Sequence, residues 1–137
     1  MTTAVVEVVP IVLKDCLLVI GATGEYQKHV SGVEFVPATS PIQWKGLSPS
    51  AVFTDIGAAT WTCNLSFAQD WVTPDSLSQF LFDHEGETLP CVFEPKLGGP
   101  GFTANFVVTP GSIGGAVDSV AVSTVALGVS GRPVLVP

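Results

Sequence analysis

The chain has 137 residues, the size of one ordinary domain, and its 47% hydrophobic and 12% charged residues exclude a disordered chain. Its net charge of −7, with cations spread singly along the chain, excludes a protein that grips nucleic acid through clustered Lys and Arg. Low charge with high apolar content fits either a surface covered by partner subunits or a small, tightly packed β domain.

The N-terminal segment from Val5 to Ile20 is β-branched and apolar, which predicts strand structure. Pro10 restricts that point to a strand start, an edge or a bulge. The segment has no basic start, and Glu7, Lys14 and Asp15 interrupt its apolar run, so we expect no signal peptide. No apolar stretch approaches the ~20 residues that a membrane-spanning helix needs, so we expect no membrane partner.

A turn cluster at residues 21–26 precedes a strand within residues 28–37, where Val33 and Phe35 share one face. Residues 37–60 are broken up by Pro and Gly, which predicts a long, partly ordered loop or an extended hairpin. Long irregular segments in compact domains are often functional or mobile. This segment is therefore a candidate functional region, and a disordered surface loop is its plain alternative.

Residues 60–70 carry the clearest strand pattern of the chain. Apolar side chains alternate with polar ones: Trp61, Cys63, Leu65 and Phe67 against Thr62, Asn64 and Ser66. This period of two predicts that the apolar set faces the core and the polar set faces solvent or a lumen.

One helix is predicted around residues 74–85. Thr73 is a plausible N-cap, Pro74 suits the first helical position and Asp75 suits the positive end of the helix dipole. Gly86 is a natural stop. One buried stripe follows helical spacing: Leu77, Phe80, Leu81 and His84. At ~10 residues this helix is marginal alone, so a sheet must hold it.

Three more alternating segments, at residues 87–95, 102–110 and 120–129, are separated by Gly- and Pro-rich turns. With the earlier segments they give about seven or eight strands. We therefore expect a single mainly β domain over residues 1–137, with two packed, mostly antiparallel sheets in a sandwich-like or barrel-like arrangement and one flanking helix.

The sequence offers no convergent catalytic or metal-binding set, so we expect neither an enzyme nor a cofactor. Asp83, His84 and Glu85 are adjacent on the predicted helix and point in different directions, which favours a solvated helix end over a metal site. The cysteines are odd in number and far apart, which predicts buried free thiols in a reducing compartment: Cys16, Cys63 and Cys91. A sugar-binding platform of Trp44, Trp61 and Trp71 is the alternative to core or interface packing.

From Trp61 onward the motifs follow a specific order. A Trp-led strand ends in "AQDW", the helix "TPDSLSQFLFDHEG" follows, then a strand ending in "FEP", then "GFTANFVVTPGSIGG", and finally a strand that ends "GVSGRP". In this order the chain resembles the major tail tube proteins of long, non-contractile-tailed bacteriophages (siphophages). The resemblance covers roughly the C-terminal sixty per cent of the chain and rests on the order of motifs, not on one signature.

The resemblance implies a structural virion protein. Subunits of that family are small β-sandwiches with a flanking helix; six form a ring, and rings stack into a hollow tube through which genomic DNA passes at infection. It further implies self-association, tape measure and tail-end proteins as partners, and assembly in the host bacterial cytoplasm. DNA passes without specific binding, which agrees with the acidic balance.

The resemblance also suggests roles for particular residues. Residues 37–60 become a candidate inter-ring arm, with the interface residues Ile42, Trp44 and Leu47. The polar strand face becomes candidate lumen lining: Thr62, Asn64 and Ser66. The helix packs through Leu77, Phe80 and Leu81, and either helps to set the angle between ring neighbours or only plugs the end of the sandwich. The alternatives are another phage structural protein, in head–tail joining or capsid decoration, and a carbohydrate-binding β-sandwich.

Overall fold

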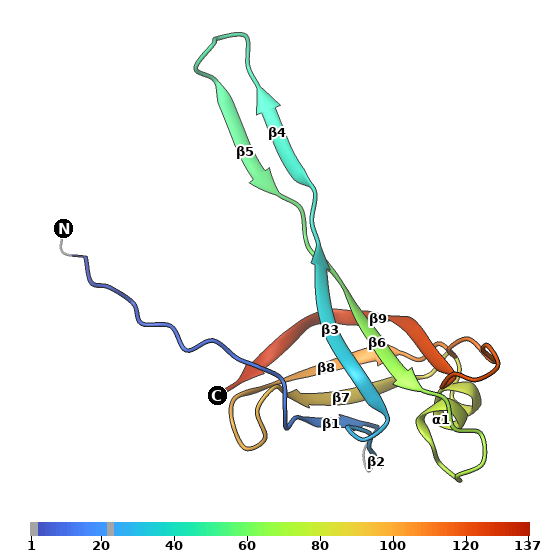
Figure 1. Cartoon of the computed structure of the whole chain (residues 1–137). Helices are drawn as coiled ribbons and strands as arrows, with labels where there is room; N and C mark the ends of the chain where they lie inside the picture. Colours follow the sequence, from blue (N-terminus) through green and yellow to red (C-terminus); the bar gives the residue numbers. More distant parts are fainter. Residues whose placement is uncertain (1–2, 22–23) are drawn as a thin grey trace.

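The computed structural model describes residues 3–21 and 24–137, which form nine strands and one short helix (Figure 1). In chain order these elements are β1 (Leu17–Ile20), β2 (Gly24–Glu25), β3 (Val30–Ala38), β4 (Pro41–Lys45), β5 (Val52–Ile56), β6 (Thr60–Ala68), α1 (Leu77–Asp83), β7 (Thr88–Glu94), β8 (Gly101–Val107) and β9 (Val122–Val136).

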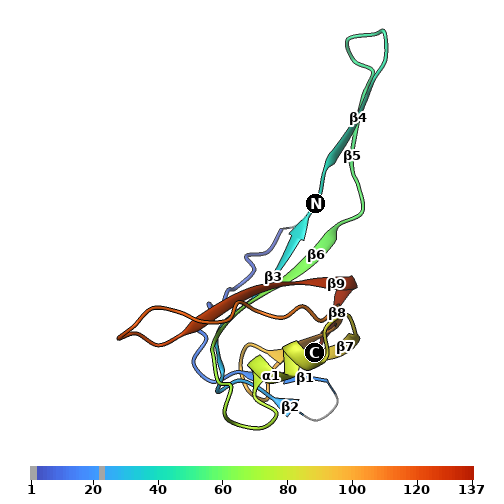
Figure 2. The same ribbon diagram turned by 90° about the vertical axis from the view of Figure 1, so that its right-hand side faces the viewer.

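Seven strands form one antiparallel sheet in the order β2-β1-β7-β8-β9-β6-β3, and β4 and β5 form a separate two-stranded ribbon. The large sheet bends over itself, so that β3, β6 and β9 lie across β1, β7 and β8 (Figure 2). Phe35 of β3 and Phe93 of β7 meet between these layers, with ring centroids 6.3 Å apart. The expected mainly antiparallel, sandwich-like fold with one flanking helix is confirmed, and its layers come from one continuous sheet.

The core fills the space between the layers. Its side chains come from alternate positions of the strands, from one side of α1 and from the ends of two strands: Leu18, Ile20, Tyr26, Cys63, Leu65, Phe67, Leu77, Leu81, Cys91, Phe93, Phe106, Val108, Val125 and Leu127. The alternation predicted for residues 60–70 is confirmed, because Cys63, Leu65 and Phe67 are buried. Trp61 is only half-buried, since it lies where β6 leaves the body of the sheet.

The prediction of strand structure from Val5 to Ile20 was wrong for most of that segment. Only Leu17–Ile20 pairs with neighbours, whereas residues 3–13 run outward without a ladder partner (Figure 1). β-branched residues favour an extended backbone, but a strand also requires an adjacent strand to bond with its N–H and C=O groups. Among residues 3–21 and 24–137 this segment finds none.

The last strand is longer than its sequence pattern predicted, because β9 continues past residue 129 to Val136. Gly131 and Pro133 are ordinary strand-breaking signals. The β8–β9 register instead shifts between Thr103 and Asn105, and Gly131 takes φ 83°. A bulge thus accommodates both residues, and the strand resumes beyond them.

The predicted helix start at Thr73–Pro74–Asp75 was wrong, since α1 begins at Leu77. The Asp70 carboxylate accepts hydrogen bonds from the Val72 and Thr73 N–H groups and holds them in a turn. The pKa of Asp70 is lowered, first by hydrogen bonding from the Thr73 side chain and then by these two backbone N–H groups. Asp75 has φ 61°, which no helix can include.

Ser76 is the actual N-cap of α1. Its Oγ accepts from the Gln79 N–H at 3.4 Å and donates to the Asp70 carbonyl. Ser76 and Gln79 have the S-x-x-Q spacing of a capping box, a signal that the sequence reasoning overlooked. At the other end His84 is the C-cap, and Gly86 follows at φ 85°, close to the predicted stop.

Substituting each of the two candidate N-cap residues, Ser76 and Thr73, tests at which of them α1 begins. We expect Ser76→Ala to lower the free energy of unfolding by about 1–2 kcal/mol, because a buried hydroxyl that both accepts and donates is lost. Thr73→Ala removes an exposed side chain outside the helix and should cost clearly less. Urea denaturation of both variants measures the difference, and an equal loss would contradict the assignment of Ser76.

Candidate functional site

The β4–β5 ribbon is a hairpin that projects far from the sandwich (Figure 1). It grows out of β3 and β6, which lead into it on adjacent strands of the sheet. Bonds close it at both ends: the Gly46 N–H donates to the Ala51 carbonyl at 2.7 Å, and the Gly57 N–H donates to the Ser40 carbonyl at 2.9 Å. Residues 37–60 are therefore an ordered hairpin with its connections, the second of the two forms expected for this segment.

One face of the hairpin is aromatic and aliphatic. Trp44 pairs with Phe53 and Ile42 pairs with Asp55, so these four side chains share a face. Trp44 is 70% exposed and Phe53 58% exposed. We name Ile42, Trp44 and Phe53 the hairpin face.

The predicted interface residues Ile42 and Trp44 thus lie together, while Leu47 lies fully exposed in the loop at the tip. Sequence reasoning missed Phe53. The cross-strand register would have revealed it, because the residue opposite Trp44 must lie on the same face.

A two-stranded ribbon is at best marginally stable alone in water. Here it also exposes two large aromatic rings, which cost free energy in contact with water and gain it when a partner covers them. The hairpin face is therefore the strongest candidate for a protein-binding surface on the described chain.

A second candidate surface is the side of β6 that turns away from the core. Thr62, Asn64 and Ser66 lie there, as the alternation predicted. Their neighbours in the ladders share this outer face: Gly32, Glu34 and Val36 of β3, and Thr124, Ala126 and Gly128 of β9. Glu34 is the one charged residue among these nine, so this outer face carries one negative charge and no cation.

The helix-packing residues lie where the sequence predicted. Leu77 and Leu81 are fully buried in the core, and Phe80 packs on Tyr26 with ring centroids 5.5 Å apart. The helix closes one end of the sandwich (Figure 2). On its other side Phe82 stays 54% exposed and meets Trp71 edge-to-face at 6.2 Å, which leaves an aromatic pair on the surface. A role in setting the angle between subunits stays a prediction.

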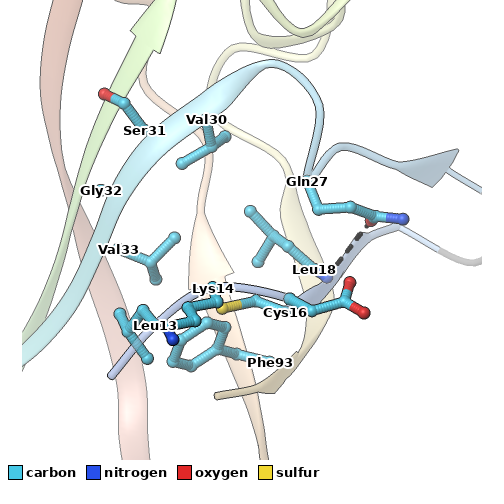
Figure 3. Close-up of a pocket in the computed structure, with 11 residues that line it drawn as sticks. Leu13, Lys14, Cys16, Leu18, Gln27, Val30, Ser31, Gly32, Val33 and Phe93 are labelled. Atoms are coloured by element: carbon cyan, nitrogen blue, oxygen red, sulfur yellow. Dashed lines mark hydrogen bonds between the residues drawn. The ribbon is translucent and has the colours of Figure 1, made fainter. Parts of the chain in front are cut away.

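A pocket of about 320 Å³ lies at the seam between β1 and β3, which the sheet brings close without hydrogen-bonding them (Figure 3). Leu13, Lys14 and Cys16 border it on one side and Val30 and Val33 on the other. The Leu18 N–H donates to Gln27 Oε1 at 3.4 Å beside it. Since β1 and β3 form no ladder here, the sheet stays open along this seam.

The cysteines are free thiols in the structure, and Cys63 and Cys91 are buried while Cys16 is half-buried. Burial raises the pKa of Cys63 to about 12, with a further contribution from Cys91, and burial raises the pKa of Cys91 to about 12. Both are therefore protonated and unreactive near neutral pH. The Cys16 thiol donates to the Pro95 carbonyl at 3.2 Å.

This difference is measurable by thiol titration. We expect a water-soluble disulfide reagent at pH 8 to label Cys16 alone in the folded protein, because the other two thiols are buried and protonated. All three cysteines should react in denaturant. Rapid native labelling of Cys63 or Cys91, identified by peptide mass, would contradict the buried assignment.

The residues weighed for metal or sugar binding do not converge. His84 Nδ1 pairs with Glu87 Oε2 at 2.6 Å on the surface, and over residues 3–21 and 24–137 no three His, Cys, Asp or Glu side chains group closely enough to hold a metal. Trp44 lies on the hairpin, Trp61 at the start of β6 and Trp71 beyond its end, so they form no common platform. No helix in the described part of the chain is long and apolar enough to cross a membrane.

Comparison with known proteins adds no assignment: no protein-family model and no curated protein matches the sequence.

Proposed function

We propose that this protein is a structural subunit of a siphophage tail tube, in which hexameric rings stack into a hollow tube that genomic DNA traverses. The order of sequence motifs from Trp61 onward supports the proposal. The fold is compatible with it, since a sandwich-like β domain with one flanking helix is what the resemblance implies.

The single observation that carries the proposal is the projecting hairpin. A soluble monomer gains nothing from holding Trp44 and Phe53 on a ribbon far from its core. A subunit that contacts the next ring gains an anchor, because buried Trp side chains supply much of the binding energy of interfaces. The hairpin is thus assigned to contacts between stacked rings.

The outer face around Asn64 suits the wall of a DNA channel. A wall bearing Lys or Arg would retain phosphates through counterion release, whereas a wall without cations lets them slide. The outer face has no cation and one carboxylate, that of Glu34. In this proposal Thr62, Asn64 and Ser66 line the lumen, and the remaining partners are the tape measure and tail-end proteins of the virion.

Electron microscopy of the purified full-length protein over a range of concentrations tests the proposal. We expect rings at low concentration and stacked tubes with an open lumen at high concentration, because the exposed hairpin face is covered only in an assembly. Sedimentation measured in parallel should show mass rising steeply above a threshold. A monomer that persists at millimolar concentration would refute self-assembly.

A further inference from the structure

The sheet forks at the end of the sandwich opposite α1. β6 and β9 are paired from Ala68–Val122 to Trp61–Val129 and separate beyond that point. Among the described residues, β9 beyond the bulge at residues 131–133 pairs with β8 alone, through Val134, Leu135 and Val136, which leaves its second edge without a ladder partner. An open strand edge of this kind can accept another strand.

An apolar cleft of about 670 Å³ occupies this fork. Its lining is mostly aromatic and aliphatic: Val33, Phe35, Trp61, Phe93, Phe102, Pro133, Val134 and Leu135. Glu34 and Arg132 are the charged residues that border it, and no salt bridge joins Arg132 to another described residue. The volume lies within the roughly 300–1,000 Å³ of pockets that bury a ligand, so the cleft has room for several aliphatic side chains.

The N-terminal segment of residues 4–13 has the properties of a strand that fits such a cleft. It is extended, unpaired and apolar, and its side chains are exposed: Val5, Val6, Val8, Val9, Ile11, Val12 and Leu13. In an extended chain Val6 and Val8 face one way and Glu7 the other. Glu7 is the one charged residue of this segment, and its charge is opposite to that of Arg132.

We propose that the N-terminal segment of one copy lies as an added strand in the β6–β9 cleft of a second copy. Val6 and Val8 enter the apolar cleft, Glu7 lies toward Arg132 at its rim, and the backbone bonds with the free edge of β9. This contact rests on the proposed function, because it requires that the protein assembles with itself. It adds to that function a second interface, separate from the hairpin.

The occupant is a second copy because of where the segment starts and runs. Leu13 borders the β1–β3 pocket, which shares Val33 and Phe93 with the cleft. From there the segment leads outward, away from its own sandwich (Figures 1 and 2). It therefore presents its apolar side chains at a distance where a neighbouring subunit can cover them.

Cross-linking between engineered cysteines tests the contact directly. In a Cys16→Ser background, Val8→Cys combined with Val134→Cys should give, under mild oxidation after assembly, a ladder of linked chains on a non-reducing gel. Val8→Cys alone and Val134→Cys alone are the controls and should give no ladder beyond a dimer.

The possible results of this experiment distinguish the proposed contact from the proposed tube function. Tubes that form without the ladder would overturn the proposed contact and leave the tube function standing. A ladder without rings or tubes would support the contact and refute the tube. A bond formed within a single chain, seen as thiol loss without a change in mass, would overturn the assignment to a second copy.

A matched pair of charge substitutions gives the second measurement. Val8→Asp should raise the concentration needed for assembly by about tenfold or more, because it places an unpaired charge in the apolar cleft. Val5→Asp adds the same charge on the opposite face and should change that concentration by less than about twofold. Both residues are exposed in the single chain, so folding measured by circular dichroism should be unchanged; equal effects would overturn the proposed orientation.

Discussion

Trp44→Asp should abolish tube formation while leaving the monomer folded. The Trp44 side chain is 70% exposed and lies on the projecting hairpin, far from the core, so the sandwich does not depend on it. In the proposed assembly the same ring is an interface anchor, and truncating such an anchor typically costs about 2–4 kcal/mol. A loss of ~2 kcal/mol raises the concentration needed for assembly about thirtyfold, and the added charge raises it further.

Gln43→Asp is the matched control. It adds the same charge one residue away, on the face of the hairpin opposite Trp44 and Phe53. We expect tubes from this variant at nearly the wild-type concentration, and unchanged melting temperatures for both variants. Sedimentation velocity and electron microscopy supply the readout. Normal tubes from Trp44→Asp would contradict the assignment of the hairpin to the interface between rings.

Phe106→Ala should be the most damaging substitution for folding. Phe106 is 0% exposed and lies in the middle of the core between the two layers. Removing such a ring leaves a cavity and costs about 3–5 kcal/mol. This is a large part of the roughly 5–15 kcal/mol that stabilises a typical domain, and it should lower the melting temperature by roughly 10–20 °C.

Phe82→Ala provides the comparison with the same residue type. Phe82 is 54% exposed on α1 and contacts Trp71 at the surface. Its loss should cost well under half as much as the loss of Phe106, measured by thermal and urea unfolding. A similar cost for both variants would show that the surface aromatic pair is part of the folding core.

Much of the fold could be predicted from local pattern. Alternation identified the buried face of β6 at Cys63, Leu65 and Phe67, and helical spacing identified Leu77 and Leu81 as core residues. These predictions held because burial repeats every two residues in a strand and every three or four in a helix. Apart from the N-terminal segment, where most of a predicted strand is absent, the errors fell at element ends. Asp70 and Asp75 form a turn, so α1 begins later in the chain than predicted. A bulge at Gly131 lets β9 continue to a later residue than predicted. Neither the turn nor the bulge produces a periodic pattern in the sequence.

Only some residues of the candidate surfaces could be predicted from the sequence. The sequence predicted Ile42 and Trp44 as interface residues, whereas Phe53 joins them on one face only through the register of β4 and β5. The cleft was invisible, because Trp61, Phe102 and Leu135 come from three strands far apart in the chain. They come together because strands that are distant in the sequence pair with one another, and no local sequence pattern predicts that pairing.

By itself, the sequence determined a mainly β domain with one helix and a core built from alternating residues, because these follow from composition and from the periodicity of neighbouring residues. The tertiary structure alone decided that β3, β6 and β9 cross over β1, β7 and β8, that the hairpin stands away from the body, and that residues 3–13 run outward unpaired. These features depend on which strands hydrogen-bond with one another, and that choice is made by packing across the whole chain.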